Sequence, residues 1–396
     1  MKKNDSRGIF DLFRCNWILL IVYFVMLFVS LWSDFAIYTI CVFCMIAYIV
    51  IPLRRYIDKT AIFLFLFSTY YCLLLLFIGV GSWFKFVSYL LCPLIFYIYG
   101  KYIVDKLISF QNLAVFLCIS ISLFSVVLYI SAIQDIIQNG FINIHREFYI
   151  WGINNTDESW SATLYGIIAS LGLVGLPLVI VKNIGLIVKA VFLLLSILSL
   201  ATVLHLVNRT GIVVECICFF IVGIYVLKEK ENRILKLGIL MFLIFIILSN
   251  FLCVDSDIFE AYSHRNEGSM DGERFDRWID GIHNFVKYPL GWVLESTQYN
   301  YVHNLWLDIA RVSGFIPFVF FLVATLLSYC DFLKLLRSND MIIIPLLLGI
   351  NICFLLTSMV EPIIEAVPLY FYLYLMIWGI QNRTLSRLNA RICDRI

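Results

Sequence analysis

The stretch that decides the fold is residues 255–311, DSDIFEAYSHRNEGSMDGERFDRWIDGIHNFVKYPLGWVLESTQYNYVHNLWLDIAR. It gathers charged, histidine and aromatic residues into one long polar interruption of a strongly hydrophobic chain. Of the 396 residues, 62% are hydrophobic and 14% are charged, whereas a soluble domain carries about 25% charged residues. We therefore expect an integral membrane protein that does its chemistry at this polar stretch.

Outside this stretch, the sequence consists mainly of apolar runs long enough to cross a bilayer. Runs of about 18 or more apolar residues are typical of membrane-spanning α-helices, whereas a β-barrel would show short alternating segments. We expect an all-α, polytopic membrane protein. Its predicted spans, about twelve in number, lie near residues 17–32, 35–53, 61–80, 83–100, 112–133, 161–181, 184–204, 211–227, 234–252, 305–328, 341–360 and 363–380.

The lysine and arginine residues set the expected orientation of these spans. With both termini in the cytoplasm, most basic residues fall on the cytoplasmic side, as the positive-inside rule predicts. Those residues include Arg54, Arg55, Lys59, Lys101, Lys106, Lys182, Lys228, Lys230, Arg233, Lys236, Lys334, Arg337, Arg383, Arg387, Arg391 and Arg395. The chain is then expected to form one membrane domain, residues 1–396. A large outer loop, residues 253–304, would cap the site, and residues 134–160 would form a second outer loop.

Residues 273–286 of the larger loop have the periodicity of an amphipathic helix. Its apolar arc comprises Phe275, Trp278, Ile279, Ile282, Phe285 and Val286. We expect this helix to lie on the outer membrane surface or over a cavity, with its aromatic stripe inward. Arg274 and Arg277 lie at the edge of the arc. Without other evidence, they would solvate the helix and contact lipid headgroups.

Five more positions are candidates for a site. His303 and Asn304 stand where the loop re-enters the membrane, although an interfacial histidine can also serve only to bond a backbone carbonyl. Arg209 lies between two apolar runs, where insertion of an arginine costs about 2.5–3.5 kcal/mol. It is therefore a functional candidate unless it snorkels at a helix end. Glu361 and Glu365 are expected near the outer ends of the last spans, where they could pair with these arginines.

The sequence also lacks several signatures. It contains no Gly-rich phosphate loop of the ATPase type and no histidine and carboxylate cluster with metal-ligand spacing. We therefore expect no cofactor, no metal and no nucleic-acid partner. A flippase would carry charges inside several helices around a central cavity. Because the polar residues here gather on one side, a flippase or other transporter is the weaker alternative to an enzyme.

Four short motifs resemble the signature of the O-antigen polymerase and ligase superfamily. They are GERFDRW at 272–278, PLG at 289–291, HNLWLDIARVSGFIPF at 303–318 and NRTG at 208–211. The expected topology is similar to that family along the whole chain. In the family, a glycine and an arginine precede the tryptophan of the external loop. Here Glu273 is inserted after Gly272, so either Arg274 or Arg277 fills that role.

The resemblance implies a glycosyltransferase that uses an undecaprenyl-diphosphate-linked glycan at the periplasmic face of the bacterial inner membrane. It implies His303 as the general base, and it implies that the diphosphate is held by Arg209, Arg274 and Arg277. Supporting roles would fall to Asn304, Trp278 and Glu361. We favour a polymerase, which joins lipid-linked repeat units, and the close alternative is a ligase, which moves the polymer to lipid A–core. A chain-length regulator protein would be a further partner.

Overall fold

The computed structural model describes residues 16–31, 33–79, 83–107, 109–141, 143, 147–151, 160–176, 185–228, 270–295, 299, 301–337 and 343–393. This part is helical apart from turns and one short antiparallel pair, β1 (Glu147–Phe148) with β2 (Trp160–Ser161). Within it, six helices are long and apolar enough to cross a membrane. The all-α, multi-pass class is therefore confirmed. The span predicted at 234–252 lies outside the described residues, and a total of twelve stays a prediction.

The chain divides into two compact units, which are described separately. The first unit comprises residues 1–113, 272–339 and 358–396, and the second comprises residues 114–271 and 340–357. The first contains α1 (Trp17–Phe28), α2 (Ser33–Val50), η2 (Leu53–Arg55), α3 (Lys59–Ile78), α4 (Trp83–Lys106), most of α12 (Met270–Lys287), α13 (Leu305–Ser313), α14 (Phe315–Leu336), α16 (Ile363–Ala366) and α17 (Pro368–Cys393). The second contains most of α5 (Phe110–Asn139), α6 (Ala162–Ser170), η3 (Leu171–Gly175), α8 (Leu186–His205), α9 (Arg209–Lys228) and most of α15 (Ile343–Val360).

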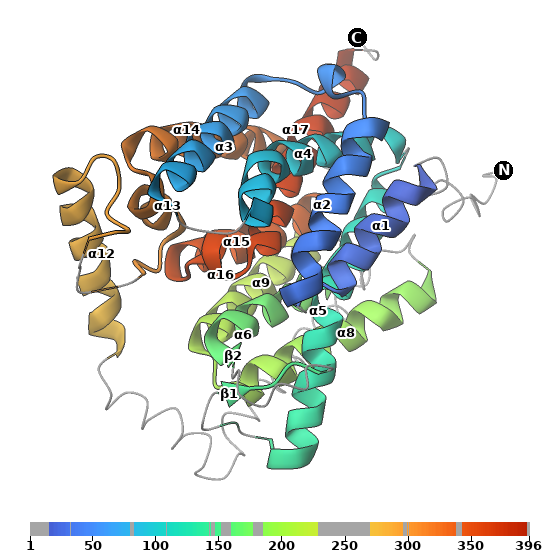
Figure 1. Cartoon of the computed structure of the whole chain (residues 1–396). Coiled ribbons are helices and arrows are strands. Elements are labelled where there is room, and N and C mark those ends of the chain that lie inside the picture. The colour runs from blue at the N-terminus through green and yellow to red at the C-terminus, as the bar shows by residue number, and fades with distance from the viewer. Residues whose placement is uncertain are drawn as a thin grey trace. The chain divides into compact units, whose positions relative to one another are not determined.

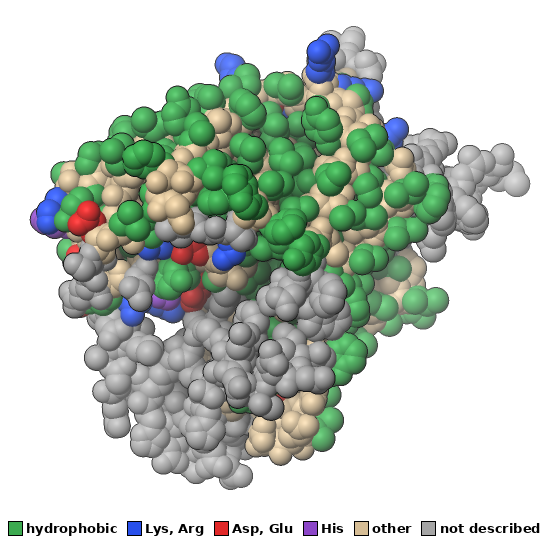
Figure 2. Space-filling view, in the orientation of Figure 1, with side chains coloured by type: hydrophobic (Ala, Val, Ile, Leu, Met, Phe, Trp, Pro, Cys, Tyr) green, Lys and Arg blue, Asp and Glu red, His purple; other side chains and the backbone are tan. Residues whose placement is uncertain are grey.

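Helices α4 and α17 form the centre of the first unit and lie along one another (Figure 1). Their backbones meet at two glycines, since a Cβ on Gly100 would overlap the carbonyl oxygen of Met376, and one on Gly379 would overlap that of Tyr97. Small residues permit this close approach in membrane helices. Helix α3 packs on α4 and on α14, and Figure 2 shows mostly hydrophobic side chains on the face over α3 and α14.

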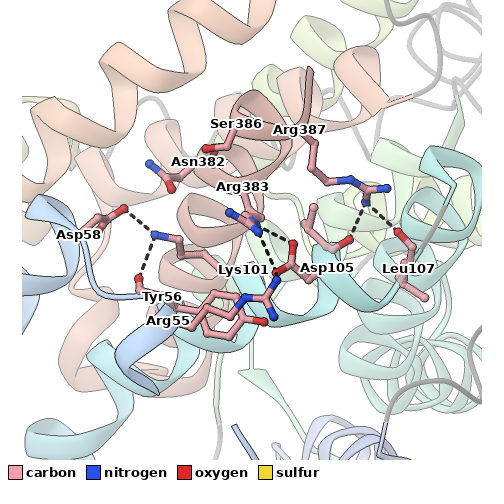
Figure 3. Close-up of polar contacts among 11 residues, drawn as sticks. Arg55, Tyr56, Asp58, Lys101, Asp105, Leu107, Asn382, Arg383, Ser386 and Arg387 are labelled. Atoms are coloured by element: carbon pink, nitrogen blue, oxygen red, sulfur yellow. Dashed lines mark hydrogen bonds and ion pairs between the residues drawn. The ribbon is translucent and has the colours of Figure 1, made fainter. Parts of the chain in front are cut away.

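A polar network ties the last turns of α4 to α17 and to the start of α3 (Figure 3). Asp58 caps α3 by accepting from the backbone N–H of Ala61 at 2.9 Å. Its other oxygen accepts from the buried Lys101 Nζ at 2.6 Å. Asp105 accepts twice from Arg383, at 2.6 and 2.9 Å, in the fork geometry typical of an arginine–carboxylate pair. Several of the basic residues expected on the cytoplasmic side therefore meet at one end of α4.

The other end of α4 reaches a different polar region of the first unit. Tyr89 donates its hydroxyl to the carbonyl oxygen of Ile364 in α16 at 3.0 Å. A helical rise of about 1.5 Å per residue separates Tyr89 from Asp105 by about 24 Å. The polar network of Figure 3 and the surroundings of α16 thus lie at opposite ends of a membrane-length helix.

The single span predicted at 305–328 is wrong. The chain forms the short helix α13, breaks at Gly314 and continues as α14. Gly314 has φ 72° and ψ −162°, a backbone region open essentially to glycine alone. The break could not be predicted, because the run is apolar throughout and the spacing of apolar residues does not indicate where one helix ends and another begins. Likewise, the run at 363–380 is divided into α16 and α17, and the run at 161–181 begins with α6 and η3.

Candidate functional site

His303 occupies a strained backbone position in the first unit. Its φ is +57°, which is uncommon for a residue with a side chain. Asp308 holds the turn from below, since its two carboxylate oxygens accept from the N–H groups of Val302 at 2.9 Å and Asn304 at 3.1 Å. The side chain of Asn304 caps α13 by accepting from Leu307 N at 3.2 Å. The residues on both sides of His303 are therefore bonded through their backbone N–H groups to one buried carboxylate.

Asp308 is fully buried, with 0% of its surface exposed. Burial raises the pKa of the Asp308 carboxyl, while the N–H donors of Val302 and Asn304 and the charge of Arg311 act to lower it. The free energy that Asp308 loses by desolvation is offset by these bonds only while the His303 turn keeps its shape. Asp308 is thus a structural clamp on the candidate base.

An ion pair also joins α13 to α16. The buried Arg311 donates to Glu365 Oε1 at 2.6 Å and lies 5.2 Å from the ring centroid of Tyr301. Burial raises the pKa of the Glu365 carboxyl, and the neighbouring Arg311 charge acts to lower it. Glu365, which was expected to pair with Arg209, Arg274 or Arg277, thus pairs with Arg311 instead, and this ion pair holds α13 against α16.

Glu361 brings two of the candidate residues together. Its carboxylate, on a residue only 4% exposed, accepts from Arg274 Nη2 through Oε1 at 3.3 Å. The other oxygen, Oε2, lies 3.5 Å from Nδ1 of His303. Arg274 comes from α12, His303 from the turn before α13, and Glu361 from the link between α15 and α16. Three separate segments thus meet at one carboxylate.

Helix α12 packs on the His303 turn through a narrow face. Trp278 donates its indole N–H to the carbonyl oxygen of His303 at 3.4 Å. A Cβ on Gly281 would lie 2.6 Å from Val302, so the glycine permits close approach of the helix. Trp278 and Phe285 pack against the buried cluster of Trp292, Val302 and Ala310.

The apolar arc of α12 divides between two environments, since two of its residues pack inward and four do not. Phe275, Ile279, Ile282 and Val286 are each more than half exposed. The helix turns Trp278, Gly281, Asn284 and Phe285 inward instead, because the glycine lets the backbone approach and the two aromatic rings fill the space beside it. Hydrophobicity alone does not predict which face of the helix packs on the protein, since a membrane protein also presents apolar side chains to lipid.

Arg277 lies one turn along α12 from Arg274, and its guanidinium is 5.0 Å from the ring centroid of Tyr299. At this position, Arg277 can either contact a bound ligand or stack on the ring of Tyr299. Arg274 differs from it by its contact with Glu361, which also faces His303. Of the two arginines, Arg274 is therefore the one that the described contacts connect to the candidate base.

Arg209 is the first residue of α9 in the second unit, and its side chain lies outside the described part of the structure. The preceding turn is tightly held. Val207 has φ +48°, and Asn208 Oδ1 accepts from Gly211 N at 2.8 Å. Among the described residues, Val207 and His303 are the two non-glycine residues with positive φ. Such strain often marks functional positions. Here one strained residue is the predicted base His303, and the other lies two positions before Arg209.

A buried histidine next to this turn was not among the predicted site residues. His205 Nε2 lies 2.7 Å from Asp135 Oδ2, and Nδ1 lies 2.7 Å from the carbonyl oxygen of Phe141. Asn143 also donates to Asp135, at 2.8 Å, and its backbone N–H donates to His205 O at 2.9 Å. These bonds fix the end of α8, four residues before Arg209. Sequence spacing gave no signal for them, because the partners lie far apart in the chain.

Chemically, the first unit offers a guanidinium for an anionic group and an imidazole for proton transfer, joined by a buried carboxylate. Charged and histidine side chains are visible beside α12 in Figure 2. Among the described residues, no group of three or more histidine, cysteine, aspartate or glutamate side chains is placed to hold a metal ion.

Comparison with known proteins gives one family match. Residues 194–322 match the family model described as O-antigen ligase. This stretch includes Arg209, Arg274, Arg277 and His303, and Glu361 lies beyond it. No curated protein matches the chain. The match confirms the resemblance to the O-antigen polymerase and ligase superfamily.

Proposed function

We propose, from the premise that residues 194–322 form an O-antigen ligase family region, that this chain is a glycosyltransferase of lipopolysaccharide biosynthesis. It would be an O-antigen polymerase, which joins undecaprenyl-diphosphate-linked repeat units at the periplasmic face of the inner membrane. The observation that carries the proposal is the meeting of Arg274 and His303 at Glu361. This places an anion-binding group next to a proton acceptor, as such a transfer requires.

The donor supplies its own energy, since the glycosyl–diphosphate bond is the one that breaks. Charge builds on the diphosphate as it leaves, and preorganised cationic donors stabilise that charge. Arginine suits this role because its planar fork binds phosphate oxygens in pairs. In the proposal, Arg274 supplies this contact in the first unit, and Arg277 assists it. Arg209 is included as a further diphosphate contact because of its Asn-Arg-Thr-Gly motif and because the family match covers it.

The acceptor hydroxyl must lose a proton as it attacks the anomeric carbon. Histidine is the side chain best suited to accept a proton near neutral pH. His303 is the proposed base because Asp308 and Asn304 hold its turn, and because its ring faces Glu361. The exposed Tyr301, next to His303, offers a surface on which a sugar ring could stack.

Two observations support the proposed side of the membrane. The basic residues around Arg383 gather at one end of α4, and α16 meets the other end. If the basic end is cytoplasmic, as the positive-inside rule requires, then Glu361 and His303 face the periplasm. Twelve spans, cytoplasmic termini and periplasmic loops at 134–160 and 253–304 belong to the same proposal.

The second candidate is an O-antigen ligase, which transfers the finished polymer to lipid A–core. The description of the matched family favours it. Both activities use the same donor chemistry and differ in the acceptor, so the described residues serve either. A chain-length regulator would be a partner of the polymerase.

The lipopolysaccharide ladder of a deletion strain tests the proposal. Loss of the polymerase leaves core bearing a single repeat unit, and the full ladder returns with the intact gene. Core without any repeat, together with accumulated lipid-linked polymer, would identify the ligase instead. An unchanged ladder would contradict both activities.

A further inference from the structure

The two contacts of Glu361 are unequal. Its bond to Arg274, at 3.3 Å, has the geometry of a hydrogen bond. Its approach to His303 Nδ1, at 3.5 Å, falls short of one. Among the residues that the structure describes, this buried Nδ1 has no hydrogen-bond partner. The carboxylate is therefore held by the arginine and stands just out of reach of the imidazole.

We propose that Glu361 is a positioning residue that couples donor binding to the orientation of His303. In this scheme, the donor diphosphate takes Arg274 away from Glu361. The released carboxylate then closes on His303 and accepts a hydrogen bond from Nδ1–H. The inference rests on the proposed function, and it adds an order of events: the base becomes competent only after the donor is bound.

Competition for Arg274 follows from charge. A diphosphate carries more negative charge than one carboxylate, and its oxygens match the guanidinium fork. Glu361 is buried, so once it loses Arg274 it is a buried negative charge without a partner. Such a charge is costly, and a new hydrogen-bond donor lowers that cost. His303 Nδ1 is within 3.5 Å of Oε2. A shift of a few tenths of an ångström would bring this pair within ordinary hydrogen-bond distance.

The closing of Glu361 on Nδ1 determines which nitrogen acts as the base. When Nδ1–H donates to the carboxylate, the neutral ring keeps its lone pair on Nε2. The acceptor hydroxyl passes its proton to Nε2 while its oxygen bonds to the anomeric carbon. The bond from that carbon to the diphosphate oxygen breaks, and the electron pair leaves with the diphosphate. Proton and electrons are thus balanced without another reactant.

Glu361→Gln tests this coupling, because it should change donor binding and turnover in opposite directions. The neutral amide competes less for Arg274, so the purified full-length variant should bind undecaprenyl diphosphate about two- to fivefold more tightly. The amide also fails to hold Nδ1–H as a carboxylate does, so kcat with lipid-linked repeat units should fall by about tenfold or more. A residue with a merely structural role would not tighten binding while slowing turnover.

Asp276→Asn is the matched control, because it removes an exposed carboxylate of α12 two positions from Arg274. It should leave kcat unchanged, and any gain in donor binding should be smaller than that of Glu361→Gln. Glu361→Asp keeps the charge but withdraws it by one methylene group. It should show both changes in smaller size, and it serves as the test if the glutamine variant does not fold.

The outcomes separate this inference from the proposed function. If Arg274→Ala weakens undecaprenyl diphosphate binding but neither Glu361 variant tightens it, the coupling is wrong and the diphosphate contact stands. If Arg274→Ala leaves that binding unchanged, the diphosphate role of Arg274 fails, and the coupling fails with it. Equal losses of binding and turnover in the Glu361 variants would contradict the coupling and show a structural role.

Discussion

At the scale of single residues, two buried carboxylates contact His303 or hold its backbone turn. Its left-handed backbone is held by Asp308, and its ring faces Glu361. Sequence reasoning could single out His303 and Arg274, because polar residues in a hydrophobic chain stand out. It could expect an arginine partner for Glu361, and the structure identifies that partner as Arg274. It could not find the clamp, because Asp308 within an apolar run is indistinguishable from any other charge at a helix start.

Arg209 provides a prediction at this scale. We expect Arg209→Lys to reduce activity nearly as much as Arg209→Ala, because a point charge does not reproduce the two-pronged contact of a guanidinium with phosphate. The measurement is the length distribution of the polysaccharide made in a deletion strain that carries each variant at equal expression. A fully active lysine variant would show that Arg209 acts only as a snorkelling charge.

At the scale of elements, the junction of α13 and α14 organises the first unit. Phe315 N donates to Pro289 O at 2.8 Å, and Trp292 N donates to Arg311 O at 2.8 Å. The Pro-Leu-Gly segment and the Trp292 that follows it are thereby bonded to both sides of the break at Gly314. The sequence predicted α12 as an amphipathic helix with arginines at its edge. Neither the break at Gly314 nor the packed face of α12 could be predicted from the sequence. Both depend on glycine contacts between segments that are not neighbours in the chain.

Gly314→Ala tests this junction. A Cβ there would overlap the carbonyl oxygen of Pro289, in a backbone region nearly closed to alanine. We expect the free energy of unfolding to fall by about 1–3 kcal/mol or more, measured by thermal unfolding in detergent. Gly79→Ala is the matched control, because Gly79 has φ +74° but nothing within 4 Å of an added Cβ. It should cost about 1 kcal/mol. Equal losses in the two variants would contradict the packing argument.

At the scale of the whole molecule, the side of the membrane on which His303 acts depends on which end of α4 faces the cytoplasm. Composition and run length predicted the helical, multi-pass class. They placed span ends less well, because α13 and α16 are short helices joined to long ones. The arrangement of basic residues predicted an orientation, and orientation is a property of the membrane and not of internal contacts.

Cysteine labelling tests this orientation. In a variant without the native cysteines, a cysteine introduced at the exposed position Glu295 should react with a membrane-impermeant thiol reagent applied from the periplasmic side. A cysteine at the exposed Lys334, in the last turn of α14, should react only after the membrane is opened. Both should retain activity. The reverse pattern of labelling would place His303 in the cytoplasm and overturn the proposed side of the reaction.

The central claim is that this chain transfers a glycan from a lipid diphosphate with His303 as the base. The most direct test uses the purified protein in liposomes with undecaprenyl-diphosphate-linked repeat units as sole substrate. We expect the wild-type protein to form polymer and release undecaprenyl diphosphate. We expect His303→Ala to bind the donor but to turn over about 10²- to 10⁴-fold more slowly. Polymer formation at the wild-type rate by His303→Ala would contradict the account. So would a wild-type protein that transfers no glycan, either between repeat units or, when lipid A–core is added, to lipid A–core.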